Sequence, residues 1–146
     1  MSQSPLLQVR NLHTIFPTES GEVRAVNGIN FSLARGKVLG IVGESGSGKS
    51  VTAYSILRIL DNPGKITQGS VLFEEEDLVR LSPGEMRHVR GAKISIIFQD
   101  PMTSLNPVYT VGNQLSEAIR LHTRRNRQQA RARALEMLTL VGVNEP

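Results

Sequence analysis

Two stretches near the start of the chain alternate apolar with polar or small residues. Alternation of this kind is typical of strands that bury one face and expose the other to solvent. The stretches are Leu6–Leu12 and Ala25–Leu33, and the polar sequence Thr18–Gly21 between them predicts a turn. The early part of the chain therefore predicts an antiparallel β layer.

The pattern changes after the turn at Arg35–Lys37. Val38–Val42 is apolar apart from one glycine, which predicts a parallel strand covered on both faces. A glycine-rich loop follows it, and a helical pattern then runs from Lys49 to about Leu60, where Asp61–Gly64 stops it. The apolar side chains that we expect on the buried side of this helix are Ala53, Ile56, Leu57 and Leu60.

The remainder of the chain mixes both kinds of element. Gly69–Phe73 and Lys93–Phe98 have the composition of strands, while Ser82–Glu85 has the capping residues that open a brief helix. Two longer helices are predicted at about Val111–His122 and Asn126–Val141. Strands that alternate with helices predict an α/β fold.

Composition narrows the class of protein without naming a function. The chain has 146 residues, 39% of them apolar and 21% charged, which suits one ordinary soluble domain. It contains no cysteine, which excludes disulfides and thiolate chemistry, and it has no apolar run long enough to span a bilayer. The net charge of +4 is concentrated late in the sequence, where we expect a solvated helix face made by Arg120, Arg124, Arg125, Arg127, Arg131 and Arg133.

One short segment carries specific chemistry. It matches the phosphate-loop motif G-x-x-x-x-G-K-[ST] completely, and it lies between a predicted strand and a predicted helix, as the mechanism requires. Glycines let such a loop curl so that several backbone N–H groups meet the same phosphate group. The matching residues are Gly43, Glu44, Ser45, Gly46, Ser47, Gly48, Lys49 and Ser50.

The last residues of the motif have distinct roles. We expect Lys49 to reach the β- and γ-phosphates and the Ser50 hydroxyl to complete the shell of a magnesium ion. The positive end of the following helix, where Val51 lies, adds to the attraction. The motif therefore predicts a site for a nucleoside triphosphate, and ATP with Mg²⁺ is the expected pair.

A second stretch, Ile97–Pro107, extends the comparison with known families. Together with Ile41–Ser50 it resembles the ATP-binding subunits of ABC transporters, and among these the bacterial importers of dipeptides, oligopeptides and nickel. The resemblance covers Leu6 to about Val143. It implies a partial phosphate-loop NTPase (RecA-like) core with the antiparallel β layer at about residues 5–100, and the start of an α-helical subdomain at about residues 101–146.

The resemblance also implies roles for residues outside the loop. The resemblance implies that Gln99 is the glutamine that contacts Mg²⁺ and the attacking water. Gln99 is therefore expected to bind the metal, and Lys49 and Gln99 are the expected catalytic residues. Phe16 is the candidate for stacking on adenine, although it equally suits a packing role at the end of a strand. The segment Asp100–Tyr109 is expected to contact a membrane permease. A second nucleotide-binding subunit is the expected dimer partner, and the expected location is the cytoplasm, peripheral on the inner face of the bacterial cell membrane.

Several parts of the family pattern do not occur in these 146 residues. They are the signature segment, the Walker B strand with its catalytic glutamate, and the switch histidine, so we expect hydrolysis by this chain alone to be very slow or absent. Two alternatives remain open. One is a self-contained phosphate-loop NTPase or kinase that uses Asp100 for the metal, and the other is a basic nucleic-acid-binding protein. No nucleic acid is expected under the preferred interpretation.

Overall fold

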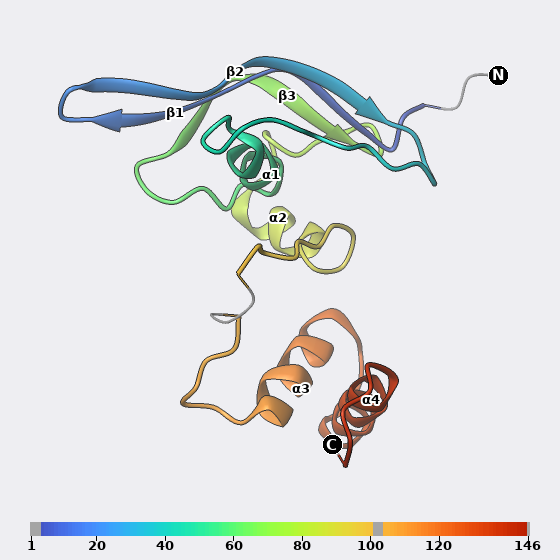
Figure 1. Cartoon of the computed structure of the whole chain (residues 1–146). Helices are drawn as coiled ribbons and strands as arrows, with labels where there is room; N and C mark the ends of the chain where they lie inside the picture. Colours follow the sequence, from blue (N-terminus) through green and yellow to red (C-terminus); the bar gives the residue numbers. More distant parts are fainter. Residues whose placement is uncertain (1–3, 101–103, 146) are drawn as a thin grey trace. The chain divides into compact units, whose positions relative to one another are not determined.

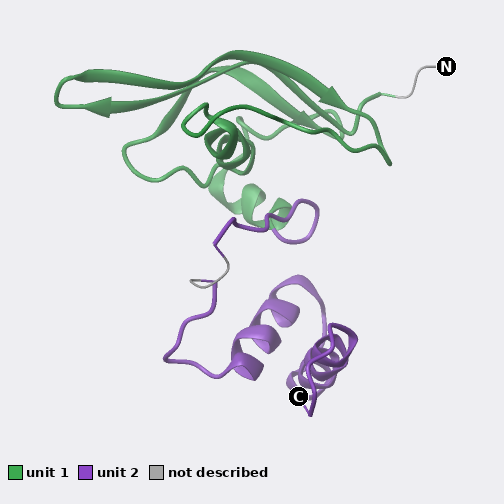
Figure 2. Ribbon diagram, viewed as in Figure 1, with its two compact units in different colours: residues 1–90 green, residues 91–146 purple. Residues whose placement is uncertain are grey.

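The computed structural model describes residues 4–100 and 104–145. These fall into two compact units, residues 1–90 and residues 91–146, which Figure 2 colours separately. The first unit contains a β-sheet and two short helices, and the second contains two longer helices (Figure 1). Every helix within the described ranges is too short or too polar to cross a bilayer.

The sheet of the first unit is four-stranded and antiparallel, with the strand order β2-β1-β3-β4 (Figure 1). Its strands are β1 (Leu7–Thr18), β2 (Gly21–Leu33), β3 (Lys65–Phe73) and β4 (Glu76–Asp77). β1 and β2 form a hairpin whose register begins at Thr18 opposite Gly21. The predicted antiparallel β layer is thus confirmed, and its first two strands are longer than the alternation alone indicated.

The core of the first unit lies on the side of the sheet on which α1 (Lys49–Leu57) packs, and α2 (Pro83–Val89) lies on the same side (Figure 1). The buried residues of β1 are Val9, Leu12, Thr14 and Ile15, and the breaks in their alternation coincide with register shifts in the pairing of β1 with β2. The buried apolar side chains of the unit are Val9, Leu12, Ile15, Val26, Leu57, Val71, Phe73, Leu78, Met86 and Val89.

The buried face of α1 is more polar than its sequence suggested. Its buried residues are Thr52, Ser55 and Leu57, and the hydroxyl groups of Ser55 and Thr14 in β1 are hydrogen-bonded at 2.8 Å. The predicted apolar stripe is right only for Leu57. The two hydroxyl groups can be buried between helix and sheet because they bond each other and because Ser55 also donates to the Val51 carbonyl oxygen at 2.7 Å. The helix also ends earlier than predicted, since Arg58 adopts a left-handed conformation with φ 52°.

We expect Thr14→Val to lower the free energy of unfolding by about 1–2 kcal/mol, because it removes a buried hydrogen-bond partner without changing the volume of the side chain. The double variant Thr14→Val, Ser55→Ala should cost less than the sum of the single changes. Urea unfolding of the four proteins measures both quantities. Thr67→Val, at an exposed position of β3, is the control and should change stability by less than about 0.5 kcal/mol. Strict additivity would show that the hydroxyl pair contributes nothing.

Two segments predicted as strands are not strands in the structure. Val38–Val42 runs without regular structure, with Val38 98% and Val42 94% exposed. Lys93–Phe98 is likewise irregular apart from an isolated bridge, and Ile97 is 95% exposed. A strand is stable only when a neighbour satisfies its backbone groups, and neither segment pairs with a strand inside the described ranges. The strand predictions were therefore wrong for these segments, although the compositions are those of buried strands.

Helix α2 begins with the predicted capping box. The Ser82 side chain accepts a hydrogen bond from the Glu85 backbone N–H at 3.3 Å, and the Glu85 carboxylate accepts one from the Ser82 backbone N–H at 2.8 Å. Pro83 occupies the first helical position, as predicted. The hydrogen bond from the Ser82 side chain, followed by that from its backbone, lowers the pKa of the Glu85 carboxyl.

The second unit is built on α3 (Val111–His122) and α4 (Arg127–Leu140), which pack against each other. Both start at a side-chain cap, Thr110 for α3 and Asn126 for α4. The bounds of α3 agree with those predicted and the bounds of α4 differ by one residue at each end. The buried residues of α4 are Ala130 and Ala134, small side chains that allow close contact between helices.

Candidate functional site

The loop from residue 43 to residue 50 leads directly into the first turn of α1, which begins at Lys49. Gly46 and Gly48 adopt positive φ angles of 78° and 87°, in the region that glycine enters without strain. These angles turn the chain sharply before the helix. The phosphate-loop segment thus has the curled loop and the helix start that its motif requires, whereas residues 38–42, which lead into it, are not a strand.

The N-terminus of α1 offers unsatisfied hydrogen-bond donors. The first backbone bond into the helix comes from the Thr52 N–H to the Gly48 carbonyl at 2.8 Å, so the amides of Lys49, Ser50 and Val51 precede any intrahelical bond. Gly48 at the cap position has no side chain to accept from them, and the first turn contains no acidic residue. Free N–H groups and the positive end of the helix dipole together favour an anion at this point.

Gly48 also sets how closely the loop approaches the sheet. A Cβ atom at this position would lie 2.2 Å from the carbonyl oxygen of Ala25 in β2, a distance that no side chain tolerates. The loop therefore lies directly on the backbone of β2. Gly43 is constrained more mildly, since a Cβ there would lie 2.7 Å from the Ser47 hydroxyl oxygen.

The Lys49 side chain folds across the loop. Its ammonium group donates hydrogen bonds to the carbonyl oxygens of Gly43 at 2.7 Å and Glu44 at 2.6 Å, and to the Ser47 hydroxyl oxygen at 3.2 Å. These acceptors hold the positive charge over the curl of the loop. A phosphate group within the curl would therefore meet an ammonium group and backbone amides together.

A pocket of about 400 Å³ lies beside this lysine within the first unit. One side is polar, and the rest is apolar surface from β2 and from the irregular segment that precedes the loop. Its lining residues are Ile29, Phe31, Leu39, Gly40, Ile41, Val42, Ser47, Lys49 and Thr52. The polar end of the pocket is the end at which the phosphate loop lies.

The remaining predicted site residues lie at the end of the loop itself, in β1 and in the second unit. Ser50 is exposed on the first turn of α1, and Gln99 is exposed in the second unit, whereas the loop belongs to the first. Phe16 is half-buried in β1, and a Cβ on Gly64 would lie 2.5 Å from its ring. The structure thus gives Phe16 a packing contact with the turn after α1. Its stacking on adenine stays a prediction.

The predicted permease segment, residues 100–109, is described only in part, because residues 101–103 lie outside the described ranges. Its described apolar side chains are exposed: Leu105 is 45%, Val108 82% and Tyr109 62% accessible. Asp100 is exposed as well.

Sequence reasoning missed one residue that supports the loop. The Thr52 hydroxyl donates to the Gly48 carbonyl at 2.9 Å and doubles the backbone bond made by the same residue. Thr52 could have been found from the sequence by its position two residues after the motif, in the first turn of the helix. The Ala25 carbonyl, by contrast, has no signal in the sequence, because only the folded sheet brings it to Gly48.

The chain was compared with known protein families. Residues 26–145 match the profile of the family described as "ABC transporter", which covers well over half of the chain. The chain belongs to the ABC transporter family. The resemblance inferred from the phosphate loop and from Ile97–Pro107 is thereby confirmed.

Relatives of this ABC transporter chain are ATP-binding proteins of peptide transport. It is 52% identical to the dipeptide transport ATP-binding protein DppD of Bacillus subtilis (strain 168), covering 97% of this chain and 42% of that protein. It is 50% identical to the oligopeptide transport ATP-binding protein OppD of the same organism, covering 97% and 40%. For DppD of Escherichia coli (strain K12) the identity is 48%, covering 97% and 43%. The chain spans about two fifths of the length of these relatives.

Solved structures agree with the family. The ATP-binding cassette MJ0796, a dimer bound to ADP and Pi in a post-hydrolysis state, matches with a TM-score of 0.81 and 25% identity over 95% of this chain and 58% of that one. A further dimeric structure of the same bacterial ABC transporter cassette matches equally well. The predicted α/β fold class, a partial phosphate-loop NTPase core with an antiparallel β layer, is confirmed for this ABC transporter chain.

Proposed function

We propose that this chain is the N-terminal portion of the ATP-binding subunit of an ABC importer for peptides or similar solutes. The observation that carries the proposal is the arrangement at the start of α1. There the Lys49 ammonium group lies across a curled loop, and the first helical amides have no acceptor of their own. This combination suits the phosphate groups of a nucleoside triphosphate such as ATP. Peptide-transport relatives of about 50% identity support the solute class.

The residues present fit a bound magnesium ion. Mg²⁺ prefers oxygen ligands and keeps several of its waters, so one hydroxyl and one amide oxygen from the protein suffice beside phosphate oxygens. The Ser50 hydroxyl is exposed at the first turn of α1 and is suited to this role. The resemblance to the family implies that Gln99 would supply the amide oxygen. When bound, the ion neutralises charge on the phosphates. Lys49 binds the phosphates, and Gln99 can orient a water because an amide both donates and accepts.

The proposal also assigns contacts to the rest of the nucleotide. Phe16 stacks on the base, and the loop residues and Val51 bind the phosphates.

The proposal includes two protein partners. The exposed apolar residues Leu105, Val108 and Tyr109 support contact of residues 100–109 with a membrane permease. The dimeric cassettes in the solved structures support a second nucleotide-binding subunit as partner. In this arrangement the subunit is cytoplasmic and peripheral on the inner face of the membrane. Family membership favours this proposal over a kinase that uses Asp100 and over a nucleic-acid binder.

Titration with the fluorescent nucleotide mant-ATP, with and without Mg²⁺, tests the proposal. We expect Mg²⁺ to strengthen binding to the wild-type chain. Ser50→Ala should reduce this magnesium-dependent gain by roughly tenfold, since it removes a metal ligand and leaves the amides and Lys49 in place. Ser32→Ala, at an exposed position of β2, is the control and should behave as wild type. Absence of mant-ATP binding to the folded wild-type chain would overturn the proposed function.

A further inference from the structure

The last carbonyl groups of α1 are held by a residue far along the chain. Arg90, directly after α2, donates from Nε to the Leu57 carbonyl oxygen at 2.7 Å and from Nη2 to the Arg58 carbonyl oxygen at 2.6 Å. The last turn of α1 contains no basic residue of its own. The guanidinium group of Arg90 therefore supplies both the donors and the positive charge that the C-terminal end of a helix favours.

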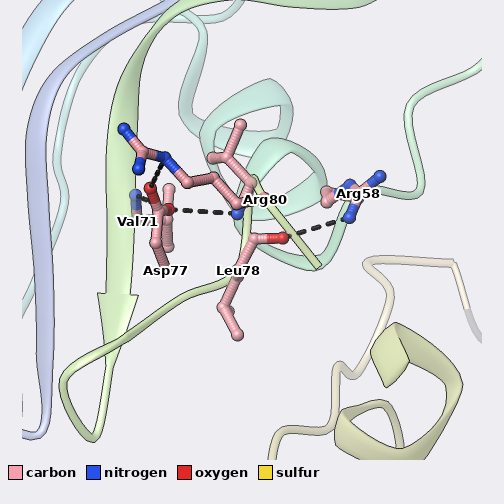
Figure 3. Close-up of polar contacts among 6 residues, drawn as sticks. Arg58, Val71, Asp77, Leu78 and Arg80 are labelled. Atoms are coloured by element: carbon pink, nitrogen blue, oxygen red, sulfur yellow. Dashed lines mark hydrogen bonds and ion pairs between the residues drawn. The ribbon is translucent and has the colours of Figure 1, made fainter. Parts of the chain in front are cut away.

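Arg58 makes the reciprocal connection. Its guanidinium group donates to the carbonyl oxygen of Leu78 at 3.1 Å (Figure 3). It also donates to the carbonyl oxygen of Leu81, and both acceptors lie in the segment between β4 and α2. Asp77 fixes the start of this segment, because its Oδ1 accepts from the Val71 and Val79 backbone N–H groups at 3.2 and 3.1 Å (Figure 3). Arg90, at the end of α2, thus binds the backbone at the end of α1, and Arg58, at the end of α1, binds the backbone just before α2. Two guanidinium groups interlock the end of α1 with the segment from β4 to α2.

The two positive charges are tolerated because each guanidinium group donates hydrogen bonds to carbonyl oxygens. Burial, and secondarily the charge of Arg58, lowers the pKa of the Arg90 guanidinium from its ordinary value. An arginine begins so far above neutrality that it remains charged at physiological pH. A lysine, with a single nitrogen, cannot donate in a planar fork to two neighbouring carbonyls in the same way.

The interlock bears on the phosphate loop because α1 is short. It has nine residues and is held to the sheet at its start, where Gly48 lies on Ala25, and in its second half, where Ser55 is bonded to Thr14. A short helix moves as a rigid rod, so a tilt about the Ser55 contact displaces both of its ends. The attachment at Arg90 opposes such a tilt and keeps the first-turn amides directed at the loop.

We propose that Arg90, together with Arg58, is a positioning residue for the phosphate-binding loop. It touches neither phosphate nor metal, and it acts by fixing the direction of α1 through the carbonyl groups at the opposite end of the helix. The inference rests on the proposed function for the identity of the ligand. It adds a residue outside the motif to the determinants of nucleotide affinity.

The experiment compares variants of the full 146-residue chain. Arg90→Gln removes the charged fork, Arg90→Lys keeps the charge alone, and Arg80→Gln is the matched control. Arg80 lies in the same region but is 87% exposed and bonded to Asp77 at 3.3 Å. A core variant, Val9→Ala, provides a protein with reduced thermal stability but an intact interlock, since Val9 lies in β1 and is 1% exposed. The readouts are the Kd for Mg²⁺–mant-ATP, the Tm, and amide hydrogen exchange over residues 45–52 without nucleotide.

For Arg90→Gln we expect a Kd raised roughly five- to tenfold and faster exchange over residues 45–52, with partial recovery in Arg90→Lys. Val9→Ala should lower Tm without a comparable change in Kd, which separates positioning from general stability. Equal effects of Arg90→Gln and Val9→Ala on Kd at equal loss of Tm would overturn the inference. Unchanged exchange over residues 45–52 in Arg90→Gln would overturn it as well.

The measurement of amide hydrogen exchange over residues 45–52 needs no nucleotide. A wild-type chain that failed to bind mant-ATP would therefore count against the proposed function, while the exchange data would still judge the positioning role.

Discussion

Lys49→Ala should weaken binding of Mg²⁺–ATP by at least roughly a hundredfold. The ammonium group lies over the curl of the loop, held there by the Gly43 and Glu44 carbonyls and the Ser47 hydroxyl. Charged hydrogen bonds to phosphate oxygens contribute about 1.5–3 kcal/mol each, so loss of two corresponds to about a hundredfold or more in Kd. Isothermal titration calorimetry on the folded variant measures the change.

The matched control is Lys37→Ala, which removes an exposed lysine from the turn before residue 38. It lowers the net charge of the chain by the same amount, so it shows how much of any loss comes from charge in general. We expect its Kd to stay within about twofold of wild type, because exposed charges are screened by salt. An unchanged affinity in Lys49→Ala would contradict the assignment of the loop as the phosphate site.

Gly48→Ala should have a still broader effect, because it damages both the loop and the fold around it. The new Cβ would lie 2.2 Å from the Ala25 carbonyl oxygen, and the residue would remain at φ 87°. The left-handed conformation alone costs about 1–2 kcal/mol for a residue with a side chain. Displacing the backbone of β2 adds to this cost, so we expect a total of about 3 kcal/mol or more in the free energy of unfolding. Mant-ATP binding should fall below detection.

Two glycine variants separate the causes of that loss. Gly46→Ala has the strain of a φ of 78°, but its new Cβ meets nothing within 4 Å. It should therefore lower the free energy of unfolding only by the cost of the left-handed conformation. Gly40→Ala has neither a positive φ nor a close neighbour and should be close to neutral in urea unfolding. If Gly48→Ala proved no less stable than Gly46→Ala, the contact with Ala25 would not be what restricts this position to glycine.

What the sequence predicted well depends on nearby residues. The bounds of α3 and the capping box of α2 follow from side chains that act within one helical turn of themselves, such as Ser82 on Glu85. The phosphate loop was found for the same reason, since a run of eight residues contains most of its chemistry. Local determinants of this kind can be read without knowing what the rest of the chain does.

What the sequence did not predict depends on residues far apart. Val38–Val42 has the composition of a buried strand, but pairing requires a partner that composition cannot supply. The Thr14–Ser55 hydroxyl pair joins residues 41 positions apart, and Arg90 reaches a carbonyl 33 positions before it. In the candidate site, the motif residues were therefore predictable, whereas the supports provided by Ala25 and Arg90 were not.

The contact between Gly48 and Ala25 has a practical consequence for protein engineering. Ala25 lies toward the middle of the β1–β2 hairpin, while the tip at residues 18–21 is exposed and remote from it in the strand pairing. Extra residues placed at the tip, such as a fluorophore attachment site or an affinity tag, leave the pairing around Ala25 intact. A single residue inserted between Ala25 and the end of β2 would instead exchange the two faces of that strand and remove the platform on which the loop is seated.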